Sequence, residues 1–414
     1  MIHPDEAIAL IARFRREPEL ETVELRQALG RILSVPIRGT MDQPPFDKSA
    51  MDGWAWNPVS GASNPDTPLR VRGVIAAGSA SIAGDRPNEP LEPGEAVRIM
   101  TGAPLPVGAS RVQRIEWSRT LESDGRATPG GSASSSGSFV GFTKKESFDN
   151  IIRRGENARS GELLLSPRIL SAQDIAILAA DGRAAVEVAR RPVVGVLSTG
   201  TELADPGEAL SDAAIYDSNR PQILTQLASP AFEIRDLGRL GDDYETTIAA
   251  VRSALETCDV LVLSGGVSMG DFDYVPRALK TAGIEELFHG VAMKPGKPTW
   301  FGTDGRAFVI GLPGNPVSVF VNTEFLVKEL LCTLCGIKYK PLIFPTPAAE
   351  DLRRKGTDRV EFLPVRIDRE GFHAVPYGGS SGLQALAAAD GFVRFEIGCD
   401  SIPKGGIELV RLVR

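Results

Sequence analysis

The chain has 414 residues, 42% of them hydrophobic, which is enough for about three packed domains. Its net charge of −7 argues against a general affinity for nucleic acid or anionic membranes, since both need concentrated lysine and arginine. Because the first residues show no basic-then-apolar leader and no apolar run approaches the length of a bilayer span, we expect a cytoplasmic protein.

The first 45 residues are expected to be largely helical. Pro4–Phe14 places its apolar residues at helical spacing after a proline and an aspartate, a typical helix start. Val23–Leu33 predicts a second amphipathic helix, and Ala172–Ala180 predicts another much later in the chain.

Residues 46–155 predict a β-rich domain. Short apolar runs punctuated by glycine and proline extend from Leu69 to Trp117, without a long helical period. Before them, the motif SAMDG (49–53) places Asp52 at a turn that exposes its carboxylate, although a simple Asx turn would explain the same dipeptide. Residues 122–137 are rich in glycine and serine, so we expect a mobile loop there.

From Arg191 the pattern changes to alternating strands and helices. Strands are predicted at Val193–Leu197, at Phe232–Leu237 and at the start of Cys258–Pro276, with helices between them that begin after acidic residues. Such a succession predicts a mostly parallel sheet with helices on both faces and ligands beyond the carboxyl ends of the strands. A turn at Thr303–Arg306 adds an antiparallel pair.

The stretch CDVLVLSGGVSMGDFDYVP (258–276) combines a buried strand with a glycine loop. Gly265 and Gly266 allow the backbone to approach a ligand, and their N–H groups can bind an anion. Asp271 and Asp273 would repel a bare phosphate, so they suggest a hard cation such as Mg²⁺ between the loop and the phosphate.

Other polar residues fall on the neighbouring strand-end loops: Glu202, Asp217, Ser218, Ser268, Lys294, Lys297 and Asn315. Carboxylates would hold Mg²⁺ while lysines and amides bind the rest of the anion, so phosphoanhydride chemistry without a protein nucleophile is predicted. Taken singly, Asp217 and Ser218 could only cap a helix, and Lys294 could be a surface charge.

Several familiar sites are disfavoured. The glycine loop fits neither the dinucleotide fingerprint nor the P-loop, and the three histidines lie far apart in the sequence. Cys332 and Cys335 have CxxC spacing but lie in an apolar helical pattern without a second pair of zinc ligands, so we interpret them as buried core thiols. From Tyr339 onward, short strands around one helix near Leu383–Ala389 predict a separate β domain.

Ordered motifs along almost the whole chain resemble one family. They are FDKSAMDGWA (46–55), RIMTGAPLP (98–106), IRRGEN (152–157), STGTEL (198–203), YDSNR (216–220), SGGVSMGDFDY (264–274), MKPGKP (293–298) and GLPGNPVS (311–318). They look like the MoeA-type molybdopterin molybdenumtransferases, the family of the gephyrin E domain. The resemblance implies a Mg²⁺-dependent enzyme that inserts molybdate into adenylyl-molybdopterin and releases AMP.

The resemblance also implies roles for matched residues. Asp52, Thr101, Glu202, Lys294 and Lys297 match catalytic positions. Residues matched to cofactor binding are Gly265, Gly266, Ser268, Ser218, Asn315, Ser318, Arg359 and Ser380, and the matched metal ligands are Asp217, Asp271 and Asp273. Asn157 stands where the family commonly has an acidic residue.

The fold expected is α/β plus β, with a three-layer, mostly parallel molybdopterin-binding domain, a β-rich insertion and a C-terminal β domain. The expected domains are 1–45 with 156–187, then 46–155, 188–338 and 339–414. A homodimer with sites shared between subunits is implied, and contacts with other molybdenum cofactor biosynthesis proteins fit the family. Two alternatives stay open: a molybdopterin adenylyltransferase, and a gephyrin-like scaffold.

Overall fold

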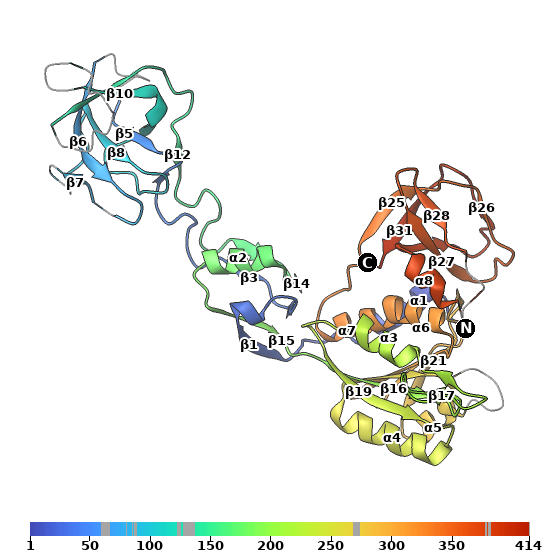
Figure 1. Ribbon diagram of the computed structural model, residues 1–414. Coiled ribbons are helices and arrows are strands. Elements are labelled where there is room, and N and C mark those ends of the chain that lie inside the picture. Colours follow the sequence, from blue (N-terminus) through green and yellow to red (C-terminus); the bar gives the residue numbers. More distant parts are fainter. Residues whose placement is uncertain are drawn as a thin grey trace. The chain divides into compact units, whose positions relative to one another are not determined.

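The structure is a computed structural model, shown in Figure 1. It describes residues 1–58, 67–79, 81–84, 86, 89–121, 126, 137–267, 274–376, 379 and 382–413. Apart from Arg126 and Gly137, the expected mobile loop at 122–137 lies outside these residues.

Contacts divide the chain into two compact units. Unit 1 contains Met1–Val35, Pro167–Ile175 and Ala185–Arg414, and unit 2 contains Pro36–Ser166 and Ala176–Ala184. The finer four-domain boundaries stay a prediction.

Unit 1 is built on a six-stranded sheet in the order β19-β16-β20-β24-β23-β21 (Figure 1). The strands are β16 (Val193–Thr199), β19 (Glu233–Leu240), β20 (Val260–Ser264), β21 (Glu285–His289), β23 (Trp300–Thr303) and β24 (Phe308–Leu312). The pairings among β19, β16, β20 and β24 are parallel, whereas β23 runs antiparallel to both β24 and β21. The mostly parallel sheet and the antiparallel pair around Thr303–Arg306 are therefore confirmed.

Helices cover both faces of this sheet. One face packs on α4 (Tyr244–Thr257) and α5 (Val275–Thr281). The other packs on α1 (Pro4–Ala12), α3 (Asn219–Gln226), α6 (Pro316–Asn322) and α7 (Lys328–Leu334), with a π-helical turn (Thr323–Val327) between α6 and α7. Alternate residues of β16, β20 and β24 enter these two cores, which explains why these central strands read as continuous apolar runs.

Helix α4 illustrates how local sequence fixes an element. The side chain of Asp243 accepts the N–H of Thr246 at 2.7 Å and caps the helix. Val251, Ala254 and Leu255 then recur at helical spacing and are buried against the sheet.

The last part of unit 1 is a second sheet in the order β22-β27-β29-β31-β25, with β28 paired to β27. These strands are β22 (Met293–Lys294), β25 (Ile343–Pro347), β27 (Val360–Ile367), β28 (Phe372–Ala374), β29 (Gly391–Phe395) and β31 (Ile407–Leu412). A pair of short strands, β26 (Leu352–Arg353) and β30 (Ser401–Ile402), and the helix α8 (Leu383–Ala388) complete this C-terminal β domain, confirming the predicted strands and helix.

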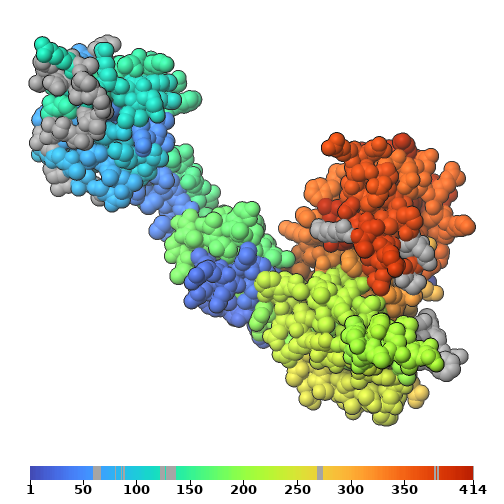
Figure 2. Space-filling model, in the orientation of Figure 1, coloured from blue at the N-terminus to red at the C-terminus, as the bar shows by residue number. Residues whose placement is uncertain are grey.

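Strand β22 belongs to the α/β domain in sequence but pairs in parallel with β27 of the C-terminal domain. Met293 lies opposite Val360, and Lys294 opposite Glu361. The two domains therefore share a sheet edge, and Figure 2 shows the red residues near the C-terminus above the yellow-green residues of the α/β domain.

The predicted helix at Val23–Leu33 is wrong. The chain instead forms β1 (Leu20–Glu24), a 3₁₀ turn (Leu25–Gln27) and β2 (Ile32–Leu33). β1 pairs with β15 (Ala185–Ala189), and β2 with β14 (Arg168–Ile169). Strand partners far along the chain outweighed the local helical pattern. The helix α2 (Ala172–Ala180) has the predicted bounds.

Unit 2 is β-rich, as expected for residues 46–155. Its main sheet has the order β10-β11-β6-β8-β5-β9, with β7 paired to β6. The strands are β5 (Gly53–Trp56), β6 (Leu69–Ile75), β7 (Ala83–Gly84), β8 (Glu95–Ile99), β9 (Arg111–Arg114), β10 (Ser118–Leu121) and β11 (Phe139–Phe142). A 3₁₀ turn (Ile115–Trp117) joins β9 to β10. The pairs β3 (Ile37–Arg38) with β13 (Leu163–Leu165) and β4 (Lys48–Ser49) with β12 (Ile151–Ile152) complete the unit.

Two further observations concern cysteines and membranes. Cys332 and Cys335 are each 1% exposed, which confirms the core-thiol interpretation. Among the described helices, none combines the length and apolar character that a membrane crossing requires.

Candidate functional site at the strand ends of the α/β domain

A cavity of about 610 Å³ lies at the carboxyl ends of β16, β20 and β24. Polar groups and glycines dominate the loops that line it. The structure brings six of the predicted residues together here: Glu202, Asp217, Ser218, Gly265, Gly266 and Asn315. Such a position at the strand ends is where open α/β sheets bind ligands.

The glycine loop closes tightly on β16. Gly265 has φ +99°, and a Cβ there would lie 2.3 Å from the carbonyl oxygen of Thr199. Its N–H donates to the carbonyl of Leu312 at 3.0 Å, so this group is not free for an anion, contrary to our expectation. Gly266 has φ +64°, and a Cβ there would lie 2.6 Å from Val275. Gly265 therefore requires glycine for close backbone approach, and Gly266 requires it because of its positive φ and the nearby Val275 side chain.

We expect Gly265→Ala to destabilise the fold by about 2 kcal/mol or more and to weaken ligand binding in this cavity, since it adds a backbone clash to a strained φ. Gly207→Ala is a matched control, because Gly207 has φ +97° and a Cβ there would meet nothing within 4 Å. Urea unfolding should show a clearly larger loss for Gly265→Ala. Equal losses would mean that the close approach to Thr199 is unimportant.

Asp217, next to the N-cap residue Ser218, accepts the first N–H groups of α3 and belongs to a partly buried ionic cluster. Its Oδ1 accepts the N–H groups of Asn219 and Arg220 at 3.0 and 3.1 Å, and its Oδ2 accepts the Ser198 hydroxyl at 2.5 Å. Arg220 also contacts Asp217 Oδ2 at 3.3 Å and pairs with Asp236 at 2.7 Å. Asp217 is 1% exposed. Both its oxygens already accept hydrogen bonds, two of them from the start of α3, as the helix-capping alternative predicts.

Two buried oxygens in the cavity lining lack a hydrogen-bond partner among the described residues: Thr199 Oγ1 and Asn219 Oδ1. The amide of Asn219 is oriented by donation to Ser264 and to the Gly314 carbonyl at 2.9 and 2.8 Å. Buried polar atoms without partners are uncommon and point to a missing ligand or water. Sequence reasoning missed both atoms, although the motifs STGTEL and YDSNR contain them.

The described side chains do not form a metal site by themselves. The described part of the chain contains no group of three His, Cys, Asp or Glu side chains that could hold a metal ion. Ser268, Asp271 and Asp273 lie outside the described residues. The orphaned oxygens of Thr199 and Asn219 can bind a hard, hydrated cation, so the described lining fits Mg²⁺ only as part of a larger set.

Of the two predicted lysines, Lys294 is the last residue of β22 and Lys297 lies on the loop that follows. The ammonium of Lys294 is 2.9 Å from Glu361, a residue of the C-terminal β domain that is 4% exposed. Lys297 is exposed, and the following Pro298 lines the cavity. The loop therefore borders the cavity, but neither lysine is among the described residues that line it.

The remaining predicted residues are less central. Ser318 is 3% exposed on α6, and Arg359 lies 3.4 Å from Asp358; neither is among the described lining residues. Ser380 lies outside the described residues. Asn157 is exposed, with its N–H bonded to the Gln43 carbonyl at 2.9 Å.

The loop 295–298, which follows β22, packs on Thr299 and Asn322. The Thr299 hydroxyl lies 2.7 Å from both the Gly296 carbonyl and Asn322 Oδ1. Gly296 has φ +112°, and a Cβ there would lie 2.3 Å from Asn322 Nδ2. Buried polar contacts thus fix the course of the loop that follows Lys294 and carries Lys297.

Unit 2 has its own candidate site around Asp52. A cavity of about 620 Å³ is lined by Asp52, Thr101, Arg114 and Trp117, among others. The N–H and hydroxyl of Thr101 donate to Asp52 Oδ1 at 2.7 and 2.8 Å. These bonds hold the pKa of Asp52 below its usual range, so the carboxylate is ionised at neutral pH. The Arg114 guanidinium lies 4.0 Å from the Trp117 ring centre.

Models of three protein families match successive parts of the chain. Residues 2–182 match the MoeA N-terminal region (domain I and II), 195–332 a probable molybdopterin binding domain, and 346–407 the MoeA C-terminal region (domain IV).

Similar proteins extend over nearly the full length. A molybdopterin molybdenumtransferase of Bacillus subtilis (strain 168) is 30% identical, covering 99% of this chain and 94% of that protein. One from Staphylococcus aureus (strain Mu50) is 33% identical, covering 93% and 88%. Crystal structures of molybdopterin biosynthesis MoeA proteins from Pyrococcus horikoshii align with TM-scores of 0.76 and 0.82 at 28% and 25% identity. They cover 100% of this chain and 99% and 100% of theirs.

Proposed function

The chain belongs to the MoeA family, and we propose that it inserts molybdate into adenylyl-molybdopterin, cleaving the phosphoanhydride and releasing AMP. The observation that carries the proposal is the nearly full-length similarity to proteins named molybdopterin molybdenumtransferase. The strand-end cavity supports it, because a glycine loop and polar groups surround a space suited to a phosphorylated ligand.

We assign the strand-end cavity to the nucleotide and pterin phosphates. Gly266, Ser218, Ser268 and Asn315 are proposed to bind them, with Gly265 acting through its close packing on Thr199. Arg359, Ser318 and Ser380 are proposed to bind the molybdate or the pterin phosphate. Both anions need positive charge and hydrogen-bond donors, and together these residues supply them.

Glu202, Lys294 and Lys297 are proposed to act on the reacting groups. Lys294 is bound to Glu361, so it can supply its charge to a substrate only by sharing or leaving that partner. Asp52 and Thr101 are proposed to act at the phosphoanhydride, where an ionised carboxylate can orient a polar group or hold a proton.

Mg²⁺ is proposed as the cofactor, held by Asp271 and Asp273 with Asp217. Asp217 would contribute only by rearranging its present hydrogen bonds, since both its oxygens accept them. When bound, the ion would neutralise charge on the phosphate oxygens.

We further propose a cytoplasmic homodimer in which sites are shared between subunits. Light scattering on the purified chain tests the assembly, and a monomeric mass at working concentrations would refute it.

Molybdate and tungstate are both tetrahedral dianions, and competition between them in the activity assay would determine which oxyanion the protein prefers. Contacts with other cofactor-biosynthesis proteins are part of the same proposal.

The activity itself is tested by giving the purified chain adenylyl-molybdopterin, Mg²⁺ and molybdate. AMP should be released only when molybdate is present. A known homologue assayed in parallel is the positive control. Absence of AMP under those conditions would contradict the proposal. ATP consumption with molybdopterin alone would indicate an adenylyltransferase instead.

A further inference from the structure

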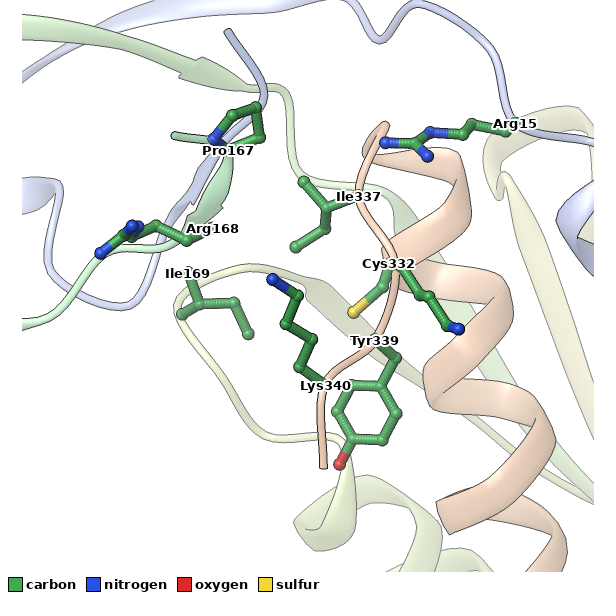
Figure 3. A pocket seen from close by; sticks show the side chains of 9 residues that line it. Arg15, Pro167, Arg168, Ile169, Cys332, Ile337, Tyr339 and Lys340 are labelled. Carbon is green, nitrogen blue, oxygen red and sulfur yellow. The ribbon is translucent and has the colours of Figure 1, made fainter. Parts of the chain in front are cut away.

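Unit 1 contains another cavity, of about 370 Å³, separate from the strand-end cavity (Figure 3). Its walls come from the segment after α1, from β14, from α7 and from the link that leads to the C-terminal β domain. The lining residues are Arg15, Pro167, Arg168, Ile169, Cys332, Ile337, Lys338, Tyr339 and Lys340. None of them is used in the proposed reaction.

This cavity is strongly cationic. Four of its nine lining residues are basic, and no acidic side chain lines it among the described residues. The chain as a whole carries a net charge of −7, so this concentration runs against the overall balance. A cationic concave surface raises the local concentration of anions.

The basic residues differ in how far they are already engaged. The Arg15 guanidinium donates through Nε to the Gly336 carbonyl at 3.0 Å, and Arg168 lies 3.3 Å from Asp174. Lys340 forms no hydrogen bond or ion pair with any residue that the structure describes. In Figure 3 its side chain points into the cavity, toward Ile169 and Ile337.

The remaining walls are apolar and chemically inert. Ile337 is 6% exposed and Cys332 1%, and Ile169 is an exposed apolar side chain at the mouth. Burial raises the pKa of the Cys332 thiol to about 12, so it is neutral. The Tyr339 hydroxyl donates to Glu324 at 2.9 Å and so is already used. Apart from its cations, the cavity therefore offers mainly apolar contact.

We propose that this cavity binds a small organic anion whose carboxylate or phosphate pairs with Lys340 and whose apolar body packs on Ile169 and Ile337. A bare inorganic anion would leave the apolar walls unfilled. A neutral apolar ligand would cover the ammonium of Lys340 without pairing it, which costs free energy. The volume lies within the range of small-molecule sites, which is about 300–1,000 Å³.

The test uses the full-length chain and three matched probes: 2-naphthoate, 2-naphthyl phosphate and the neutral 2-naphthamide. Calorimetry should show one site for at least one anionic probe and much weaker binding of the amide. Comparison of the carboxylate with the phosphate identifies the preferred head group. Failure of both anions to bind at millimolar concentration, or equal affinity for the amide, would overturn the proposal.

Variants locate the site. Lys340→Met keeps the length of the side chain but removes its charge, and should weaken anion binding at least ten-fold. Lys280→Met, at an exposed lysine in the last turn of α5, should leave it unchanged. Equal effects of both substitutions, or none from Lys340→Met, would refute the assignment. Competition by AMP would also refute it by placing the probe in the strand-end cavity, whether or not the proposed enzymatic function holds.

Discussion

Asp52→Ala is expected to slow AMP release from adenylyl-molybdopterin by about a hundred-fold or more, the range found when a positioned acid or base is lost. The side chain is exposed, the bonds from Thr101 lower its pKa further below neutrality, and it is ionised at neutral pH. Removing it therefore deletes a charge without opening a core. Single-turnover AMP release measures the chemical step, and equilibrium AMP binding should stay unchanged.

The control for Asp52 is Glu89→Ala in the same unit. Glu89 is an exposed carboxylate paired with Arg86 at 3.1 Å, and surface pairs of this kind contribute little. It should affect neither turnover nor AMP binding. Lost AMP affinity with unchanged turnover in Asp52→Ala would contradict our assignment of Asp52 to the reacting phosphoanhydride.

Arg411→Met is expected to lower the free energy of unfolding by about 3 kcal/mol, the lower end for breaking a buried ion pair. Arg411 of β31 reaches Glu324 in the π-helical turn at 3.0 Å and lies 3.8 Å from the centre of the Phe325 ring. The Glu324 side chain is 3% exposed and keeps Lys328 and the Tyr339 hydroxyl as partners, which limits the loss. Urea unfolding measures the difference.

The effect of Arg411→Met should depend on pH. Burial alone would raise the pKa of Glu324, but Lys328 and Arg411 outweigh it and hold that pKa below its usual range. A lowered pKa in the folded state stabilises the protein above the unfolded-state pKa, and this stability is lost as pH falls through the folded-state value. The difference between wild type and variant should therefore be largest near neutral pH and shrink in acid.

Arg366→Met serves as the control for Arg411. Arg366 lies on β27 of the same domain, and its side chain is 55% exposed in a 3.4 Å pair with Asp368. Its loss should change stability by less than about 1 kcal/mol. A comparable effect from both arginines, or a pH-independent effect of Arg411→Met, would show that the buried contact with Glu324 is not the cause.

Elements governed by local sequence were predicted well. α2 has the predicted bounds, and α4 begins after the aspartates that were expected to cap it. The parallel strands β16 and β20 were recognisable because burial on both faces makes them continuous apolar runs. Val23–Leu33 failed because strand pairing with residues more than a hundred positions away decides its structure.

The candidate site shows the same limit. Sequence patterns identified Glu202, Ser218 and Asn315, which meet because parallel strands end at one edge of the sheet. They could not show that Gly265 donates its N–H to Leu312, or that Lys294 pairs with Glu361. These contacts join segments that are distant in sequence, and no local signal marks them.

Because β22 pairs with β27, the C-terminal β domain also holds a segment of the α/β domain in place. Residues 293–294 pair with residues 360–361 of that domain, and Glu361 also supplies the counter-charge of Lys294. A chain truncated after α7 would keep every strand of the central sheet, yet the segment 293–297 would lose its neighbour. The two domains therefore share one boundary element, and a gene rearrangement that separated them would part Lys294 from Glu361 even though each half kept its own core.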